Sequence, residues 1–422
     1  MTKRLLLLCA AFASLASAAV DLTIAFDTTG PRRNAFPHGV PCVGYATDPQ
    51  IGDETAALAC RRAGAWLFHT TRCDDATLEF CGKYGLRLFV VLEGDQSTAI
   101  ATVNRLAQSP HKDVVAGLQL GADPTGGADP SIWRKVASVA ARQFPKAAVA
   151  LPVKGPDSPM LAAMNVGFES VTHLVVDLRD AVAPYERLEA VARRLRKSSD
   201  KRLAKLRLWT VGPGQVAGLK DANTALAWQM HWIMSAFAVD RTDGVFVERP
   251  CRADDFGLAM RHFWTSTTGN RTLVGHGEAA TSAPRENKAA KKPAVVASMD
   301  DESLVGDVVE LGEDESYRPA PVACANVVAG KSGDVEYLVL QAPPVHDDGQ
   351  RICLVVVNTV CERVKLFIDV NGTGGNVSGG WRRRLVPDAE KGVMRNSTRE
   401  RSGKPFTETI EPGEVTFIDF RI

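Results

Sequence analysis

The chain has 422 residues and nearly balanced charge, with 50 Lys and Arg against 49 Asp and Glu. This length exceeds that of one typical core, so we expect two domains, and the charge balance gives no net-charge reason to expect nucleic acid or an anionic membrane as a partner. Hydrophobic residues make up 45% of the chain and charged residues 23%, which is the composition of an ordinary soluble globular protein.

The first 18 residues have the pattern of a signal peptide. Lys3 and Arg4 form a basic start, residues 5–12 are apolar, and the Ala-Ser-Ala of residues 16–18 fits the cleavage rule. We therefore expect an exported protein, in the periplasm, on the cell surface or in the medium. No later segment has the ~20 uninterrupted apolar residues of a membrane helix, so we expect no membrane span.

Eight cysteines remain once the leader is removed. An even number in an exported chain permits disulfides, and Cys73 and Cys81 are the favoured local pair. No CxxC pair or Cys/His cluster has zinc spacing. We therefore predict no metal and no other cofactor.

Residues 19–36 contain one predicted strand, AVDLTIAFD, which would either join a C-terminal sheet or cover the floor of the next domain. From residue 37 to 274, short apolar runs alternate with amphipathic stretches of helical length, which is typical of parallel βα units. The eight expected strands lie at residues 41–45, 65–68, 86–92, 114–120, 147–152, 173–177, 206–211 and 244–248.

Eight such units predict a (β/α)8 barrel, known as a TIM barrel. An open doubly wound sheet is the alternative, but no strand is followed by a glycine-rich phosphate loop. Residues 275–303 are rich in Ala, Lys, Ser and Pro and are expected to be a linker. Residues 304–422 consist of alternating strand-like runs separated by turn sequences, which predicts a C-terminal all-β sandwich domain.

In such a barrel the active site lies where the strands end. Cleavage of a glycosidic bond needs two carboxyl groups, ~5–5.5 Å apart for retention of configuration and ~6.5–9.5 Å apart for inversion. The alternative for the acids at these strand ends is capping of the next helix, as we expect for Asp95, or pairing with a neighbouring arginine. The candidate catalytic residues are Asp123, Asp177 and Glu248, and the candidate substrate-binding residues are His69, Glu93 and Trp209.

Three segments carry a family resemblance: VVAGLQLGADP at strand four, LRLWTVGPG at strand seven, and DGVFVERP at strand eight. In residues 37–265 the chain resembles the large clan of retaining (β/α)8 glycoside hydrolases. Members of that clan carry Asn-Glu-Pro after strand four, where the Glu is the acid/base, and a nucleophilic Glu at the end of strand seven. The resemblance implies a polysaccharide or oligosaccharide as partner.

The chain departs from the clan at the positions that carry the chemistry. Ala122 replaces the Asn, Asp123 replaces the acid/base Glu, and Val211 stands at the nucleophile position. Valine can perform no covalent or acid/base step. No Glu occurs between Glu189 and Glu248, so a shifted alignment does not restore a nucleophile on strand seven.

These departures predict an exported, glycoside-hydrolase-like protein that has lost the retaining mechanism, a pseudoenzyme that binds carbohydrate. One alternative is a rewired, inverting glycosidase that uses Asp123 with Glu248 or Asp177. The other alternative is a secreted scaffold whose β-sandwich mediates binding. The sequence does not indicate the oligomeric state.

Overall fold

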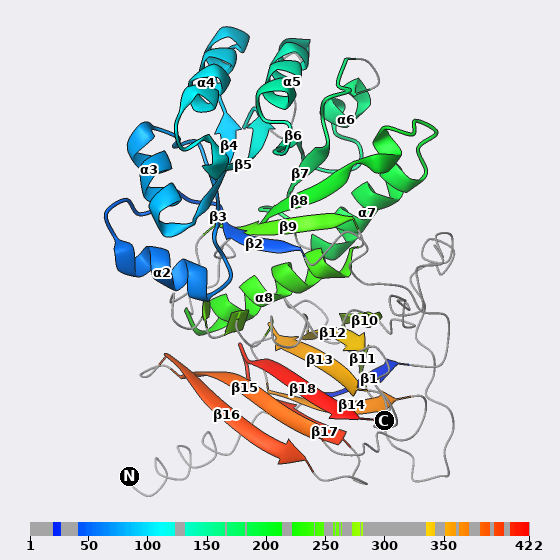
Figure 1. Ribbon diagram of the computed structural model, residues 1–422. Coiled ribbons are helices and arrows are strands. Elements are labelled where there is room, and N and C mark those ends of the chain that lie inside the picture. Colours follow the sequence, from blue (N-terminus) through cyan, green and yellow to red (C-terminus); the bar gives the residue numbers. More distant parts are fainter. Residues whose placement is uncertain are drawn as a thin grey trace, which may run out of the picture.

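The computed structural model describes most of the barrel and most strands of the C-terminal sheets (Figure 1). The described residues are 20–26, 41–122, 131–164, 167–181, 184–212, 222–239, 241–248, 256–257, 259–260, 263, 272–278, 280–281, 335–341, 351–359, 363–370, 380–388, 392–400 and 406–421. The predicted signal peptide and Asp123 lie outside these ranges, as does the predicted linker beyond residue 281.

Eight parallel strands close into a barrel in the order β2 to β9, which confirms the predicted (β/α)8 fold. The ring is completed where β2 pairs with β9, with Tyr45 opposite Val247. The strands are β2 (Cys42–Tyr45), β3 (Leu67–Thr70), β4 (Arg87–Leu92), β5 (Val115–Leu120), β6 (Ala148–Val153), β7 (His173–Asp177), β8 (Arg207–Gly212) and β9 (Thr242–Val247).

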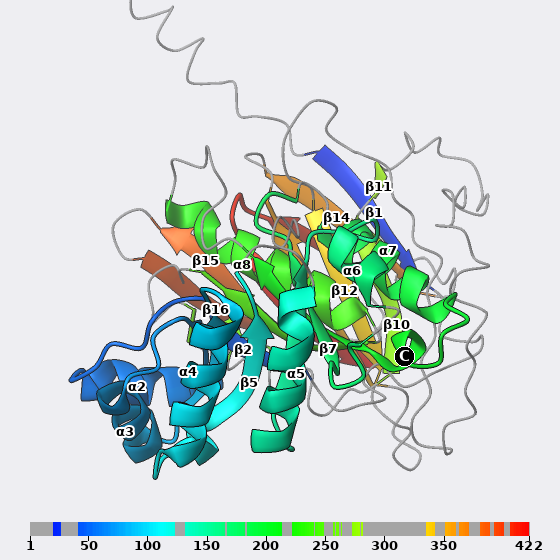
Figure 2. The same ribbon diagram turned by 90° about the horizontal axis from the view of Figure 1, so that it is seen from above.

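Helices alternate with these strands and surround the barrel, with α4 and α5 side by side (Figure 2). Asp53, Asp74 and Asp95 each cap the helix that follows by accepting a hydrogen bond from the backbone N–H three residues later. The capping role expected for Asp95 is therefore confirmed. The helices are α2 (Glu54–Arg62), α3 (Asp75–Tyr84), α4 (Gln96–Gln108), α5 (Ser131–Gln143), α6 (Pro159–Ala163), α7 (Pro184–Arg196) and α8 (Ala222–Ala238), with short 3-10 turns η1 (Lys112–Val114) and η2 (Leu203–Lys205).

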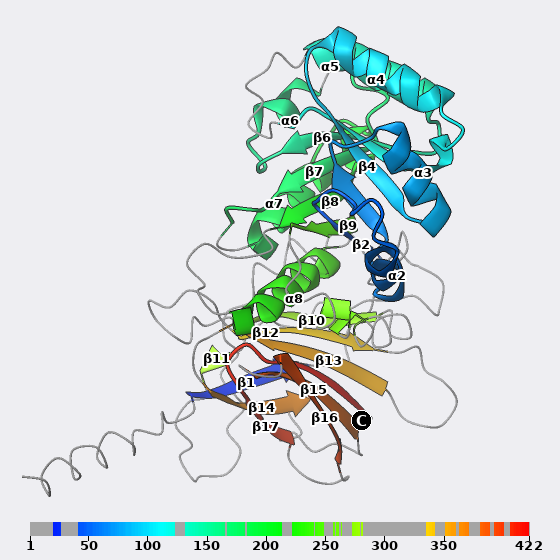
Figure 3. The same ribbon diagram turned by 90° about the vertical axis from the view of Figure 1, so that its left-hand side faces the viewer.

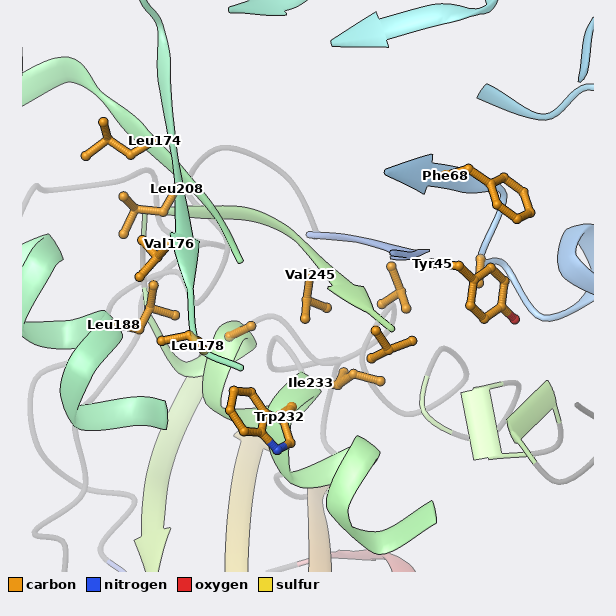
Figure 4. Close-up of a cluster of buried hydrophobic side chains, with 14 of the residues drawn as sticks. Tyr45, Phe68, Leu174, Val176, Leu178, Leu188, Leu208, Trp232, Ile233 and Val245 are labelled. Atoms are coloured by element: carbon orange, nitrogen blue, oxygen red, sulfur yellow. The ribbon is translucent and has the colours of Figure 1, made fainter. Parts of the chain in front are cut away.

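Successive residues of a barrel strand face opposite sides, and the structure sorts them into two apolar layers. On β7 and β8 the side chains of Leu174, Val176 and Leu208 face the surrounding helices, where α7 contributes Leu188 (Figure 4). The alternate residues fill the barrel interior, which consists of Leu67, Phe89, Ala150, Val175, Trp209, Val211 and Phe246.

Glycines make room for the large rings inside the barrel. Trp209 stacks on Phe246 with their centroids 4.8 Å apart, and Phe89 tilts against Trp209 at 5.3 Å. A Cβ on Gly244 would lie 2.1 Å from the Trp209 ring, and one on Gly117 would lie 2.4 Å from the Phe89 ring. The strands can therefore carry these aromatic residues only because their neighbours have no side chain.

The C-terminal strands form two sheets, which confirms the predicted β-sandwich (Figure 3). One sheet has the order β11-β1-β14-β17 and the other has the order β10-β12-β13-β18-β15-β16. The strands are β1 (Val20–Phe26), β10 (Thr272–Glu278), β11 (Ala280–Thr281), β12 (Val335–Gln341), β13 (Arg351–Asn358), β14 (Val364–Val370), β15 (Gly380–Asp388), β16 (Gly392–Glu400), β17 (Phe406–Ile410) and β18 (Val415–Arg421).

The N-terminal strand belongs to the sandwich and not to the barrel floor. Strand β1 pairs in parallel with β14 from Val20 opposite Val364 to Phe26 opposite Val370. Strand β10 spans the predicted boundary between barrel and linker and joins the six-stranded sheet, whereas β11 falls within the predicted linker and joins the four-stranded sheet. The sequence left both positions open for β1, and the pairing decides between them.

Helix α8 lies between the barrel and the six-stranded sheet (Figures 1 and 3). Its residues Trp228 and Trp232, four positions apart on one face of the helix, are buried. His231 forms an ion-pair contact with the buried Glu336 of β12, and Ser235 donates a hydrogen bond to Glu336 at 3.2 Å. These contacts bind the sandwich to the barrel.

The favoured pairing of Cys73 with Cys81 is wrong. Both residues are free thiols with buried side chains, and Cys73 receives a hydrogen bond from Arg105 instead. Burial raises the pKa of the Cys81 thiol to about 12. A free cysteine packs in a protein core like a small apolar residue, so the spacing of two cysteines alone does not identify a disulfide.

Among the described helices, none combines the length and the apolar character that crossing a membrane requires.

Candidate functional site

A cavity of about 270 Å³ opens where the barrel strands end. Its position agrees with the general location of active sites in this fold. Its walls combine apolar groups on the barrel axis with polar groups from β3, β5 and β7 and from the loops that follow β2, β3, β7 and β9. The lining residues are Ala46, Thr47, Asp48, His69, Thr70, Thr71, Val91, Gln119, Ala122, Pro152, Val175, Asp177, Arg179, Val211 and Glu248.

His69 and Gln119 form a hydrogen-bonded pair inside this cavity. Gln119 donates from Nε2 to the carbonyl of Gly121 at 2.8 Å, so its Oε1 accepts the proton of His69 Nε2 at 2.8 Å. The imidazole also stacks on Phe246 with centroids 4.9 Å apart. Burial lowers the pKa of His69 to about 4. His69 is therefore neutral at pH 7, and its Nδ1 is left as an acceptor.

Arg179 joins two of the predicted catalytic acids. It donates from Nε to Asp177 Oδ1 at 2.9 Å and from Nη2 to Asp177 Oδ2 at 2.7 Å, in a bidentate pair. Its Nη1 donates to Glu248 Oε1 at 3.2 Å. The hydrogen bonds that Arg179 donates to Asp177 raise the pKa of Arg179, so the guanidinium keeps its charge.

The two acids differ in how many of their oxygens remain available. The backbone N–H of Arg179 adds a third bond to Asp177 Oδ1 at 3.0 Å, so both oxygens of Asp177 accept hydrogen bonds within the protein. Glu248 uses only Oε1, and its side chain is 37% exposed, against 14% for Asp177. Within the described residues, Glu248 Oε2 therefore has no partner.

Asp48, which the sequence analysis did not single out, also lines the cavity. Its Oδ1 accepts a hydrogen bond from the hydroxyl of Thr70, and the backbone N–H of Arg72 donates to that hydroxyl at 2.9 Å. Asp48 follows β2 and Glu248 follows β9, and these strands are neighbours in the barrel. The carboxylates of Asp48 and Glu248 therefore lie on the same side of the rim.

The other predicted residues lie elsewhere. Glu93 is exposed and is not part of the cavity wall. Trp209 is 7% exposed, packed inside the barrel below the cavity-lining residues of its own strand, and is also not part of the wall. Asp123 lies outside the described residues, although its neighbour Ala122 lines the cavity. Val211, at the position of the clan's nucleophile, is part of the wall.

Asp180 at the same rim is held by cations and is not part of the wall. It pairs with Lys154 at 2.8 Å and with Arg187 at 2.5 Å. The hydrogen bonds from Lys154 and Arg187 lower the pKa of Asp180 to about 2. Asp180 is therefore a charged surface residue that stabilises the loop between β7 and α7.

Sequence reasoning missed several lining residues, among them Asp48, Gln119 and Arg179. Arg179 stands two residues after Asp177, and this spacing was a usable signal, because the side chain can fold back onto the carboxylate. Gln119 occurs at an inward position of β5, which the alternation along the strand would have indicated. Nothing in the sequence around Asp48 distinguishes it from a loop acid. Among the described residues no group of His, Cys, Asp or Glu is arranged to hold a metal ion.

The structure resembles solved glycosidases over nearly its whole length. It matches a glucosidase from Croceicoccus marinus with a TM-score of 0.55 and 10% identity, covering 96% of this chain and 100% of that one. It matches an arabinofuranosidase with a TM-score of 0.57 and 11% identity, covering 94% and 99%.

A third match is an α-L-arabinofuranosidase from Thermotoga maritima, with a TM-score of 0.54, 11% identity and coverage of 95% and 100%. The chain has the fold of a glycoside hydrolase. At this level of identity the likeness shows the fold alone, and function must be argued from the site. No family model matches the sequence, and no curated protein matches it either.

Proposed function

We propose that this protein binds carbohydrate in the cavity at the end of its barrel and does not hydrolyse it by the retaining mechanism. The observation that carries the proposal is the pairing of Arg179 with both Asp177 and Glu248, beside a wall that contains Val211. A retaining mechanism needs one carboxylate free to attack the sugar and a second to transfer a proton. Val211 cannot attack, and Asp177 is fully engaged by hydrogen bonds.

The cavity nevertheless has features suited to a sugar. It combines apolar surface from Val91, Val175 and Val211 with fixed hydrogen-bonding groups at His69 and Gln119. Small-molecule sites commonly consist of mostly apolar walls with a few placed polar groups. The fold shared with a glucosidase and two arabinofuranosidases supports carbohydrate as the ligand class. The pattern of residues 1–18 supports export.

The test combines a glycan array with a reducing-sugar assay, and compares the unaltered protein with Asp123→Ala. We expect binding to one class of glycan and no release of reducing ends by either protein. Release of reducing ends that disappears in Asp123→Ala would overturn the proposal in favour of a rewired glycosidase. If binding survives when all polar side chains that line the cavity are removed, the β-sandwich is instead favoured as the binding module.

A further inference from the structure

We propose that Asp48 and Glu248 are the two carboxylates that contact the sugar, and that Arg179 and Thr70 position them. Asp177 in this arrangement holds Arg179 and does not touch the ligand. This inference rests on the proposed function, because it assigns roles within the same cavity. Asp48, Thr70 and Arg179 had no role in the expectations drawn from the sequence.

The first argument is the matched hydrogen bonding of the two acids. Each has one oxygen fixed by the protein, Asp48 Oδ1 by the hydroxyl of Thr70 and Glu248 Oε1 by Arg179 Nη1. Within the described residues, each has a second oxygen without a partner, and both side chains line the cavity. A fixed carboxylate with one free oxygen can accept a hydrogen bond from a ligand hydroxyl group with little loss of side-chain entropy.

The second argument concerns how the acids are held. The backbone N–H of Arg72 donates to Thr70 Oγ1, so the hydroxyl proton of Thr70 points to Asp48. This hydrogen bond fixes Asp48 Oδ1 and leaves Oδ2 for the ligand. The bidentate pair between Arg179 and Asp177 fixes the guanidinium plane, and that plane fixes Glu248. Asp177 has both oxygens engaged and is mostly buried, so it has the properties of a support for Arg179.

The third argument is the charge of the described wall. It holds three carboxylates, one guanidinium and a neutral imidazole, so negative charge exceeds positive charge. Such a wall accepts hydrogen bonds from neutral hydroxyl groups and repels anions. The charge of the described wall therefore favours a neutral, polyhydroxylated sugar ring over uronic acids and sulfated sugars.

The experiment is titration calorimetry with methyl β-D-glucopyranoside, methyl β-D-xylopyranoside and methyl α-L-arabinofuranoside, with methyl β-D-glucuronide as the anionic probe. The variants Asp48→Asn and Glu248→Gln keep the shape of each side chain and remove its charge. We expect each to weaken binding of the neutral probe by roughly 10- to 100-fold, the range for a lost charge-assisted hydrogen bond. The matched control is Asp180→Asn, at the same rim but outside the wall, and it should change Kd by less than about twofold.

A double-mutant cycle separates positioning from a general structural effect. Arg179→Met should weaken binding in the unaltered protein and have little further effect in Glu248→Gln, because Arg179 acts through Glu248. Equal losses in both backgrounds would contradict that role. Unfolding curves confirm that each variant is folded under the conditions of the titration.

Two results overturn the inference and can be told apart. In the first, a neutral probe binds, but neither Asp48→Asn nor Glu248→Gln weakens its binding, or the glucuronide binds as tightly as the neutral probe. The assignment of Asp48 and Glu248 is then wrong, while the proposed function stands. If no neutral probe binds the unaltered protein, this assignment also falls. The glycan array then decides whether the proposed function falls with it.

Discussion

Replacing Gly244 by alanine tests whether the barrel interior is packed as described and whether Trp209 is a core residue. The new Cβ would lie 2.1 Å from Cζ3 of Trp209 and within 2.6 Å of two further atoms of that ring. Carbon atoms need roughly 3.5 Å between them, so the indole would have to move by about 1.4 Å. Phe246 and Phe89 pack against the indole, which leaves it little room.

Overpacking of a core costs typically ~1–3 kcal/mol, and the size of this clash puts Gly244→Ala near ~3 kcal/mol. For a domain of this size such a loss lowers Tm by about 6–12 °C. The assay is thermal unfolding followed by calorimetry, with Gly155→Ala as the control, because a Cβ on Gly155 would meet nothing within 4 Å. A loss below about 0.5 kcal/mol in Gly244→Ala would refute the packing described here.

Three further predictions concern a titrating group, a buried ion pair and the thiols. His69 has a pKa of about 4 in the folded protein against an ordinary value of 6.5, so its contribution to stability is complete above pH 6.5 and is lost as the pH falls towards 4. The free energy of unfolding, measured by chemical denaturation at several pH values in that range, should fall less steeply in His69→Gln than in the unaltered protein, by up to about 3 kcal/mol in total. Equal dependence on pH in the two proteins would contradict the lowered pKa of His69. Arg384→Met removes the cationic partner of the fully buried Glu414 and should lower the free energy of unfolding in urea by about 3 kcal/mol. A neutral effect would mean that the hydrogen bonds from Glu411 N and the Thr416 hydroxyl satisfy Glu414 without Arg384. Alkylation of the denatured, unreduced protein should label both Cys73 and Cys81, and a pair of unlabelled peptides in the mass spectrum would reinstate the disulfide.

The sequence was most informative about the barrel because its signal is repeated eight times. Alternation of apolar strands with amphipathic helices placed all eight strands within about two residues of their observed positions, and the closed ring follows from their number. The position of β1 was not predictable, because its pairing with β14 joins residues more than 300 positions apart. Alternation indicates that a strand exists and does not identify its partner.

The candidate site was only partly predictable for a related physical reason. The rule that active sites lie at the strand ends correctly predicted that Asp177 and Glu248 line the same cavity. Their roles depended on Arg179, and whether an arginine reaches two carboxylates is decided by side-chain conformation that a linear sequence does not carry. Asp48 was missed because nothing around it in the sequence distinguishes it from a loop acid, and its place beside Glu248 depends on the pairing of the first and last strands, which exists only once the barrel closes.

A crystal structure of the protein soaked with the tightest-binding neutral sugar tests the central claim most directly. The account predicts a sugar ring in the cavity with hydroxyl groups on Asp48 and Glu248, and with Arg179 still paired to Asp177. A sugar found elsewhere, or one whose anomeric carbon faces an Asp177 released from Arg179, would contradict it.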